Sequence, residues 1–176
     1  MSNQGVKMRV IKHGNPILRM KAEPVDLEND EIKPLIEDMF VTMDEEGGIG
    51  LAAPQVAVSK SFFVIDMGLI EDNGKLTAII NPEILETEGQ VKFEEGCLSI
   101  PDIREEVTRP ETIRVRYQDI DGQIHESEIN GMKARVFQHE IDHLNGILFI
   151  DRIGPMRRKL LNKQLKKIAA EESKYL

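Results

Sequence analysis

The sequence predicts an α+β fold: mainly antiparallel sheets packed around a central helix, with an amphipathic helix before it and a further helix at the C-terminal end. Two observations predict this class. Short apolar runs, some alternating with polar residues, are separated by turn signals through the middle of the chain, as in antiparallel sheets. Two other segments carry apolar residues at helical spacing, and a third is expected to be a helix that ends at a glycine stop signal. With 176 residues, the chain is expected to form one domain over residues 1–176.

Composition indicates a globular protein without a membrane or DNA partner. Hydrophobic residues make up 40% of the chain and charged residues 31%, which is ordinary for a globular domain. The net charge of −8 argues against a surface that binds nucleic acid as a whole. The single cysteine, Cys97, excludes an internal disulfide and fits a reducing compartment. Because no apolar run approaches the roughly twenty residues that span a bilayer, we expect a cytoplasmic protein.

The first part of the chain is expected to hold one helix. Met1 to Lys7 form a loose lead-in, and residues 8–25 are extended with turns. Asn29 or Asp30 can cap the helix that follows, and Gly47-Gly48 ends it. Its single apolar stripe, which usually packs in a core, consists of Ile32, Leu35, Ile36, Met39, Phe40 and Met43.

The middle of the chain is expected to form strands. Residues 62–65 and 76–80 are predicted to be buried strands joined by a turn at 72–74, and residues 84–93 continue as extended structure. Ile113, Val115 and Tyr117 have the alternation of a half-buried strand, which a hairpin turn at residues 121–122 connects to residues 124–129. His125 in that second strand is expected at the surface. Residues 147–150 are predicted to be a short strand.

A second helix, from near Gly131 to Asn145-Gly146, carries the motif HExxH within residues 138–143. Since positions four apart share one helical face, His139 and His143 can direct two imidazole nitrogens at one metal ion. Glu140 can then reach a water held by that ion. The alternative is a solvated, charged helix face that happens to carry two histidines.

A catalytic metal site of this kind needs a third ligand and leaves one position open. No histidine follows His143, and Cys97 is the remaining strong candidate because a thiolate is a good ligand. The alternative for a lone cysteine is a small buried hydrophobe.

The small residues of 48–53 either let another backbone approach closely or form a tight turn into a buried strand.

The last helix is expected to begin at Pro155 and to be basic. Residues 155–176 carry a net charge of +5, whereas the rest of the chain carries −13. The helix can pack on the body with its basic face in solvent, or bind an anionic partner. Its apolar stripe consists of Met156, Leu160, Leu161, Leu165 and Ile168.

Three segments together resemble a known family. In chain order, residues 48–55, 95–99 and 138–143 read GIGLAAPQ, EGCLS and QHEIDH. They resemble the three signature motifs of peptide deformylases, the metal hydrolases that remove the formyl group from new bacterial polypeptides. The resemblance also covers residues 17–19, the strands between the motifs and the terminal helix.

The resemblance implies a metal centre and its catalytic residues. Cys97, His139 and His143 would hold one divalent metal ion, Fe²⁺ in the native enzyme, with Zn²⁺, Ni²⁺ or Co²⁺ able to take its place. Glu140 would act as general base and then general acid toward the metal-bound water. The Gln55 side chain and the Leu98 backbone N–H would donate hydrogen bonds to the oxyanion.

The resemblance also implies a substrate, an N-formyl-methionyl nascent peptide from which formate is released. The extended peptide would pair with backbone near Gly50 and around Gly96. Arg104 would touch it further along. The methionine pocket would be lined by Ile49, Met132, Val136 and the stem of Glu95.

For partners, the resemblance implies a monomer that docks on the ribosome through the basic helix, which we assign to Arg157, Arg158, Lys163, Lys166 and Lys167. One rival function is an HExxH zinc endopeptidase, which would need a third ligand other than Cys97. The other is a metal-stabilised ribosome-binding module without turnover.

Overall fold

The computed structural model describes residues 5–176, so the predicted lead-in from Met1 to Lys7 lies partly outside the described residues. Its strands form a five-stranded sheet in the order β1-β2-β3-β6-β7 and a two-stranded sheet of β4 and β5, and all the strand pairs are antiparallel. The larger sheet consists of β1 (Gly50–Ala52), β2 (Phe62–Asp66), β3 (Leu76–Glu88), β6 (Thr112–Gln118) and β7 (Ile124–Asn130). The smaller sheet consists of β4 (Val91–Cys97) and β5 (Ile100–Arg109).

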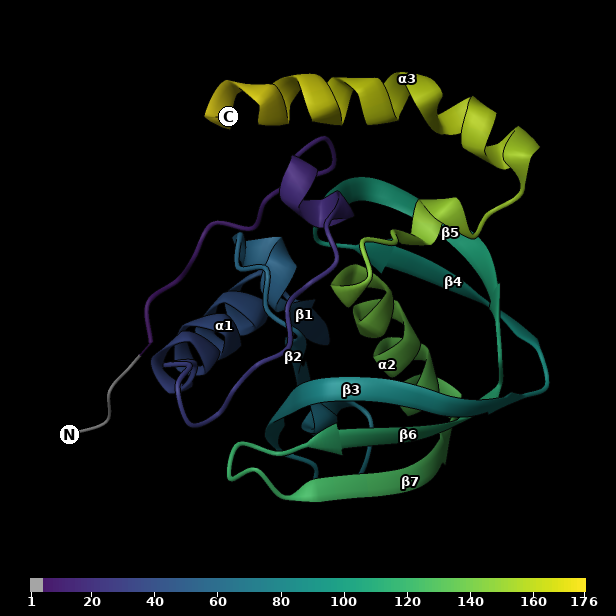
Figure 1. The fold of residues 1–176 in the computed structure, drawn as a ribbon. Coiled ribbons are helices and arrows are strands. Elements are labelled where there is room, and N and C mark those ends of the chain that lie inside the picture. Colours follow the sequence, from purple (N-terminus) through teal and green to yellow (C-terminus); the bar gives the residue numbers. More distant parts are fainter. Residues whose placement is uncertain (1–4) are drawn as a thin grey trace.

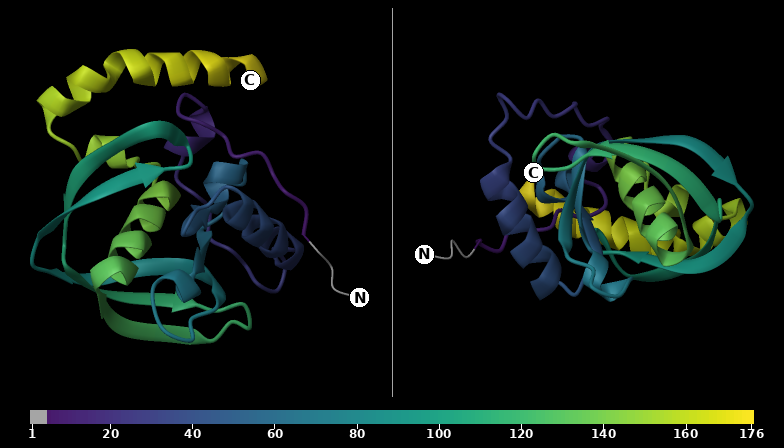
Figure 2. Two further views of the ribbon diagram at one scale, coloured as in Figure 1. Left: turned by 180° about the vertical axis from the view of Figure 1, so that it is seen from behind. Right: turned by 90° about the horizontal axis from the view of Figure 1, so that it is seen from below.

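Three α-helices accompany these sheets in residues 5–176: α1 (Lys33–Glu45), α2 (Gly131–Leu144) and α3 (Pro155–Glu172). Figure 1 shows α2 between the two sheets, α1 beside β1 and β2, and α3 along the outside of the molecule. The views in Figure 2 show the same placement from behind and from below. The predicted α+β class with mainly antiparallel sheets is confirmed.

Strand β2 is buried on both faces because it lies between α1 and α2. Phe62 and Val64 pack in one apolar cluster with the stripe of α1, whereas Phe63 and Ile65 pack in another cluster with α2. The side chains of a strand alternate between its faces, so one short apolar run contributes to both cores. The aromatic ring of Phe63 meets that of Phe137 on α2 edge-on, with 5.2 Å between centroids.

The small sheet closes over the other side of α2. Strand β5, which the sequence did not predict as a strand, contributes Ile100, Ile103 and Val107 to a third apolar cluster. Leu161 and Leu165 of α3 pack into that cluster. Helix α3 therefore covers the outer side of the β4–β5 sheet, and α2 lies enclosed beneath it (Figure 1).

Three local predictions were wrong. Helix α1 is preceded by Ile32 without a side-chain cap, because the Asp30 carboxylate instead accepts a hydrogen bond from the Asp26 backbone N–H and pairs with Lys60. Residues 147–150 form no strand; they lead into a 3₁₀-helix, Phe149–Asp151. The first part of the stripe predicted for the last helix lies in solvent, since Met156 is 78% and Leu160 67% exposed.

The remaining helix and hairpin predictions were confirmed: α1 and α2 end where the glycines indicated, and Pro155 begins α3. His125 is exposed, as expected, and is hydrogen-bonded to Asp119 at the surface. None of the helices in residues 5–176 is long and apolar enough to cross a membrane. The assignment of residues 1–176 to one domain stays a prediction.

Candidate metal centre

The two histidines of α2 face the same point. Their rings lie one helical turn apart, with 5.1 Å between centroids. The Nδ1 atom of His139 lies 2.8 Å from Oε1 of Glu95, which is acceptor-only when ionised, so Nδ1 carries the proton and the Nε2 lone pair is free to bind a metal. His143 is buried, and its Nδ1 has no hydrogen-bond partner within residues 5–176.

Cys97 reaches the histidines from the small sheet. It is the last residue of β4, where a register shift in the pairing with β5 turns the chain. Its Sγ lies 3.3 Å from Nε2 of His143. The potential ligand atoms of Cys97, His139 and His143 all lie within 4.8 Å of one another. A thiolate with two imidazoles fits a divalent transition-metal ion, and this trio leaves a fourth tetrahedral position open.

Gln55 lies beside the cysteine and is 1% exposed. It belongs to the 3₁₀-helix Ala53–Val56 that follows β1. Its Oε1 accepts from the backbone N–H of Ala52 at 2.9 Å, while its Nε2 donates to Oγ of Ser99 at 3.1 Å and lies 3.5 Å from Sγ of Cys97. Because the amide oxygen is occupied by a backbone donor, the amide nitrogen must face the cysteine.

Glu95 is the centre of a buried charge network. Besides His139, its carboxylate accepts from Arg109 at 2.6 and 3.0 Å and from Arg135 at 2.6 Å. Burial alone would raise the pKa of Glu95, but the hydrogen bonds from His139 and Arg109 hold that pKa well below its ordinary value. Glu95 therefore stays a carboxylate, which orients the His139 ring.

The network continues on the far side of α2. Arg109 also donates to Oδ2 of Asp142 at 2.8 Å, and Arg152 binds both oxygens of Asp142 at 2.5 and 2.7 Å. Asp142, a residue of the HExxH segment itself, thus ties α2 to β5 and to the chain after the 3₁₀-helix. The sequence did not single out Arg109, Arg135 or Asp142, because their partners come from separate strands and helices.

Glu140 is buried, and one of its carboxylate oxygens is unpaired among the described residues. Oε2 of this side chain has no hydrogen-bond partner within residues 5–176, and the residue is 4% exposed. Burial, reinforced by the negative charge of Glu95, raises the pKa of Glu140 to about 7. A carboxylate with such a pKa can both take and return a proton near neutral pH.

A central cavity of about 700 Å³ brings most of the predicted site residues together. Among the predicted residues, His143 alone does not line it; that side chain is buried, with its Nε2 beside Sγ of Cys97. Phe93, Ile100, Ile103 and Arg135 also line the cavity and were not predicted. Those that were predicted are Ile49, Gly50, Gln55, Glu95, Gly96, Cys97, Leu98, Arg104, Met132, Val136, His139 and Glu140.

The two glycines at the cavity, Gly50 and Gly96, differ in how well each would tolerate a side chain. A Cβ atom at Gly50 would lie 2.8 Å from Oε1 of Glu140 and 3.0 Å from Val136, so any side chain there displaces Glu140. The three atoms nearest to a Cβ atom at Gly96 would all belong to the side chain of Arg104, the closest being Nη1 at 2.8 Å. Arg104 is exposed and paired with Glu94, so it can move.

The sequence matches the polypeptide deformylase family over residues 7–159. The chain belongs to this family. Among curated relatives, the peptide deformylase of Thermotoga sp. (strain RQ2) is 51% identical over 162 residues, which cover 92% of this chain and 96% of the relative. That of Acidobacterium capsulatum is 46% identical over 159 residues, covering 90% and 94%.

Solved deformylase structures have the same fold as this chain. The peptide deformylase from Legionella pneumophila superposes with a TM-score of 0.85 at 38% identity, covering 96% of this chain and 98% of the other. The peptide deformylase from Thermus thermophilus gives 0.85 at 43% identity, covering 94% and 99%. The chain is therefore a hydrolase of the deformylase type, as the three motifs indicated. The comparisons give no support to an endopeptidase.

Proposed function

We propose that this chain hydrolyses the N-terminal formyl group of N-formyl-methionyl nascent peptides and releases formate. Family membership supports deformylation of nascent peptides in general. The observation that carries the specific proposal is the trio of Cys97, His139 and His143. Two of its members, Cys97 and His139, line the central cavity together with Glu140 and Gln55.

The trio would hold one divalent metal ion, Fe²⁺ in the native enzyme, with Zn²⁺, Ni²⁺ or Co²⁺ able to replace it. When bound, such an ion polarises the formyl oxygen and brings the pKa of water down toward about 7. Glu140, whose Oε2 has no hydrogen-bond partner in the described part of the chain, takes the proton of the attacking water. The same carboxyl then gives a proton to the departing amine.

Gln55 and Leu98 would stabilise the oxyanion that attack on the formyl carbon creates. The bond from the Ala52 N–H to the amide oxygen already holds the Gln55 amide nitrogen toward the cysteine, so this donor is oriented before the reaction begins. The backbone N–H of Leu98 is the second donor that we assign.

The peptide would lie extended along the central cavity, pairing with backbone near Gly50 and Gly96. Its methionine side chain would enter the part lined by Ile49, Met132 and Val136, with the stem of Glu95 beside it. Because the Glu95 carboxylate is fully engaged by His139 and two arginines, only its methylene groups are available to the substrate. Arg104 would touch the peptide further along.

Formate release from a formyl-methionyl tripeptide, compared with internal cleavage of an unmodified peptide, tests the reaction. We expect formate and no internal cleavage. We expect Cys97→Ser to lower the bound metal and the activity together, since it replaces a soft ligand by a weak one. Full metal content and activity in that variant would remove Cys97 from the site.

Glu140→Ala separates proton transfer from metal binding. We expect the variant to keep its metal, because Glu140 is no ligand, and to lose at least about 10²–10⁴-fold in kcat. Metal analysis and single-turnover formate release check both points. Substantial residual turnover in the metal-loaded variant contradicts the role given to Glu140.

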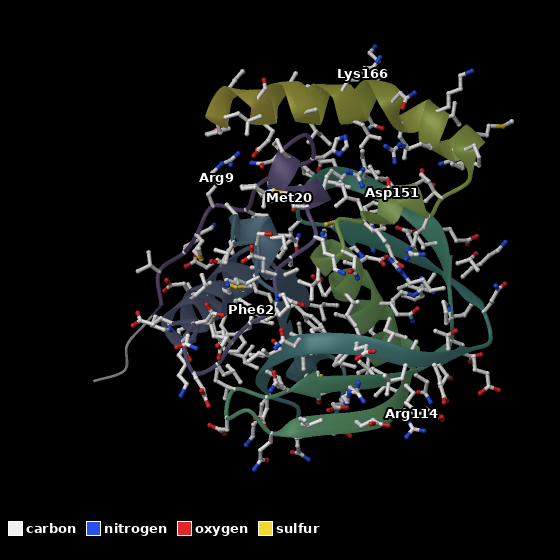
Figure 3. All side chains as sticks on the ribbon, viewed as in Figure 1. Arg9, Met20, Phe62, Arg114, Asp151 and Lys166 are labelled. Carbon is white, nitrogen blue, oxygen red and sulfur yellow. The ribbon has the colours of Figure 1, made fainter. Side chains whose placement is uncertain are left out.

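The basic helix α3 is proposed to dock on the ribosome. Arg157 pairs with Glu105 on β5 and Arg158 bonds to Asp151 and the Ile150 carbonyl, so these two partly serve the fold. Lys163, Lys166 and Lys167 are exposed, and Figure 3 shows Lys166 pointing away from the body.

We expect reversal of the three lysines to weaken co-sedimentation with ribosomes at low salt, while reversal of Lys133, which lies on α2 and pairs with Glu71, leaves it unchanged. Equal sedimentation of both variants would refute the docking surface. Cytoplasmic location and a monomeric state stay predictions.

A further inference from the structure

A second cavity of about 460 Å³ lies where the N-terminal segment meets the end of α3. Figure 3 shows Arg9 in this region, below the C-terminal half of the helix. The lining comes from both ends of the chain and consists of Lys7, Met8, Arg9, Val10, Lys12, Glu46, Pro101, Ile168, Glu171, Glu172 and Tyr175. No residue assigned to catalysis lies among them.

The second cavity adjoins the central cavity. Lys12, Glu46 and Pro101 line both, so these three residues form the border between them. Lys12 is half-buried there, and its Nζ donates to the Leu98 carbonyl at 2.8 Å. An ammonium group has three donors, which leaves two for another acceptor at the border. No carboxylate within residues 5–176 forms an ion pair with Lys12.

The charges of the second cavity largely cancel one another. Arg9 binds Glu172, which is buried, and also lies over the Tyr175 ring at 3.7 Å. Lys7 pairs with Glu46 at 2.9 Å. The remaining surface offers the apolar parts of Met8, Val10, Pro101 and Ile168 and the exposed Tyr175 ring. Such a lining suits polypeptide of varied sequence better than an anion.

We infer that the second cavity is a distal subsite for the substrate polypeptide. It receives residues about four to six of the nascent chain, which leave the central cavity across Lys12. This inference rests on the proposed function, because a chain whose formyl end lies at the metal centre must continue out of the central cavity. The free Lys12 N–H groups donate to carbonyl oxygens of the passing main chain, and the Tyr175 ring packs against its side chains.

Peptide length provides the test. We expect kcat/KM for a formyl-methionyl hexapeptide to exceed that for the tripeptide of its first three residues by on the order of tenfold, the factor expected from burying part of a side chain. The gain should lie in KM, because contacts far from the formyl group stabilise the bound substrate and the transition state equally.

Tyr175→Ala combined with Glu171→Ala changes the distal lining without touching the buried Glu172. We expect this double variant to lose the hexapeptide advantage and to keep wild-type rates on the tripeptide. Lys174→Ala is the matched control, because Lys174 is exposed and adjacent but does not line the second cavity. Equal rates on both peptides in the wild type, or an advantage unchanged in the double variant, overturn the inference.

Crosslinking separates this inference from the proposed function. A formyl-methionyl hexapeptide with a photoreactive group at residue six is irradiated with the wild-type protein, and the labelled peptides are mapped. Label on residues 7–12 or 168–175 supports the subsite whether or not formate is released. Such labelling without formate release would refute the proposed reaction and leave the subsite standing. Label confined to the β4–β5 sheet, or found on a second copy of the chain, overturns the subsite.

Discussion

Glu95→Gln tests whether the buried charge network positions the metal centre. The carboxylate accepts four hydrogen bonds, one from His139, two from Arg109 and one from Arg135. A glutamine keeps the shape but has one acceptor oxygen, and its NH₂ group would face guanidinium donors. At least two charge-assisted bonds are lost, each of about 1.5–3 kcal/mol. We therefore expect a loss of about 3–5 kcal/mol in the free energy of unfolding.

The same substitution should act on the metal. Without a carboxylate on Nδ1, the His139 ring is less well oriented and less basic, which typically lowers metal affinity about 10–100-fold. Urea unfolding and competition with a chelator measure the two effects. Glu94→Gln is the matched control, since that neighbouring carboxylate is exposed and Arg104 is its one ion-pair partner among residues 5–176. We expect it to change the unfolding free energy by less than about 1 kcal/mol.

Two results would refute this reasoning. One is a Glu95→Gln protein that unfolds within about 1 kcal/mol of the wild type, since a buried network of this kind must respond more strongly. The other is a destabilised variant whose metal affinity is unchanged, which would make Glu95 purely structural. If Glu95→Gln does not fold, Glu95→Asp, which keeps the charge, provides the chelator measurement.

Two further predictions concern packing and pH. Gly50→Ala should lower kcat at least about tenfold with metal retained, because its Cβ displaces Glu140. Gly154→Ala should be neutral in steady-state formate release, because no described atom lies within 4 Å of the added Cβ. Glu172, bound by Arg9, has a pKa held below the ordinary 4.5, since its hydrogen bonds outweigh burial. The contribution of ionised Glu172 to the free energy of unfolding is thus complete above pH 4.5 and is lost as the pH falls through the pKa of the folded state. In denaturant titrations, the wild type should exceed Glu172→Gln in stability at pH 7 and lose this advantage in acid; a constant difference contradicts the assignment.

Much of the architecture could be predicted because local signals and tertiary packing agree. The apolar stripe of α1, the hairpin before residue 130 and the glycine after α2 each have one local interpretation. Predictions failed where tertiary packing, rather than local sequence, determines which residues are buried. Met156 and Leu160 continue a helical stripe by spacing, yet the surface beneath α3 accommodates only its later turns.

The candidate site divides in the same way. HExxH places two ligands on one helix, so local spacing reveals them, and the motif around Cys97 indicated the third. Arg109 and Arg135 carry no such signal. Each resembles an ordinary surface arginine in the sequence, and only the fold brings both to the carboxylate of Glu95. Ser99, which holds the Gln55 amide, could have been found from its place in the EGCLS segment.

The two-sided burial of β2 has a consequence for how the catalytic carboxylate is accommodated. Since both faces of β2 are apolar, a shift of its pairing register by one residue would move Phe62 into the cluster of Phe63 and Phe63 into the cluster of Phe62. Both clusters are apolar, so hydrophobicity alone would oppose this register shift only weakly. The pairing of β1 with β2 places Gly50 opposite Ile65 and hence beside Glu140. Such a shift would bring Leu51 there instead. Folding fidelity in this strand pair, rather than any contact with substrate, therefore determines whether the active site has room to form.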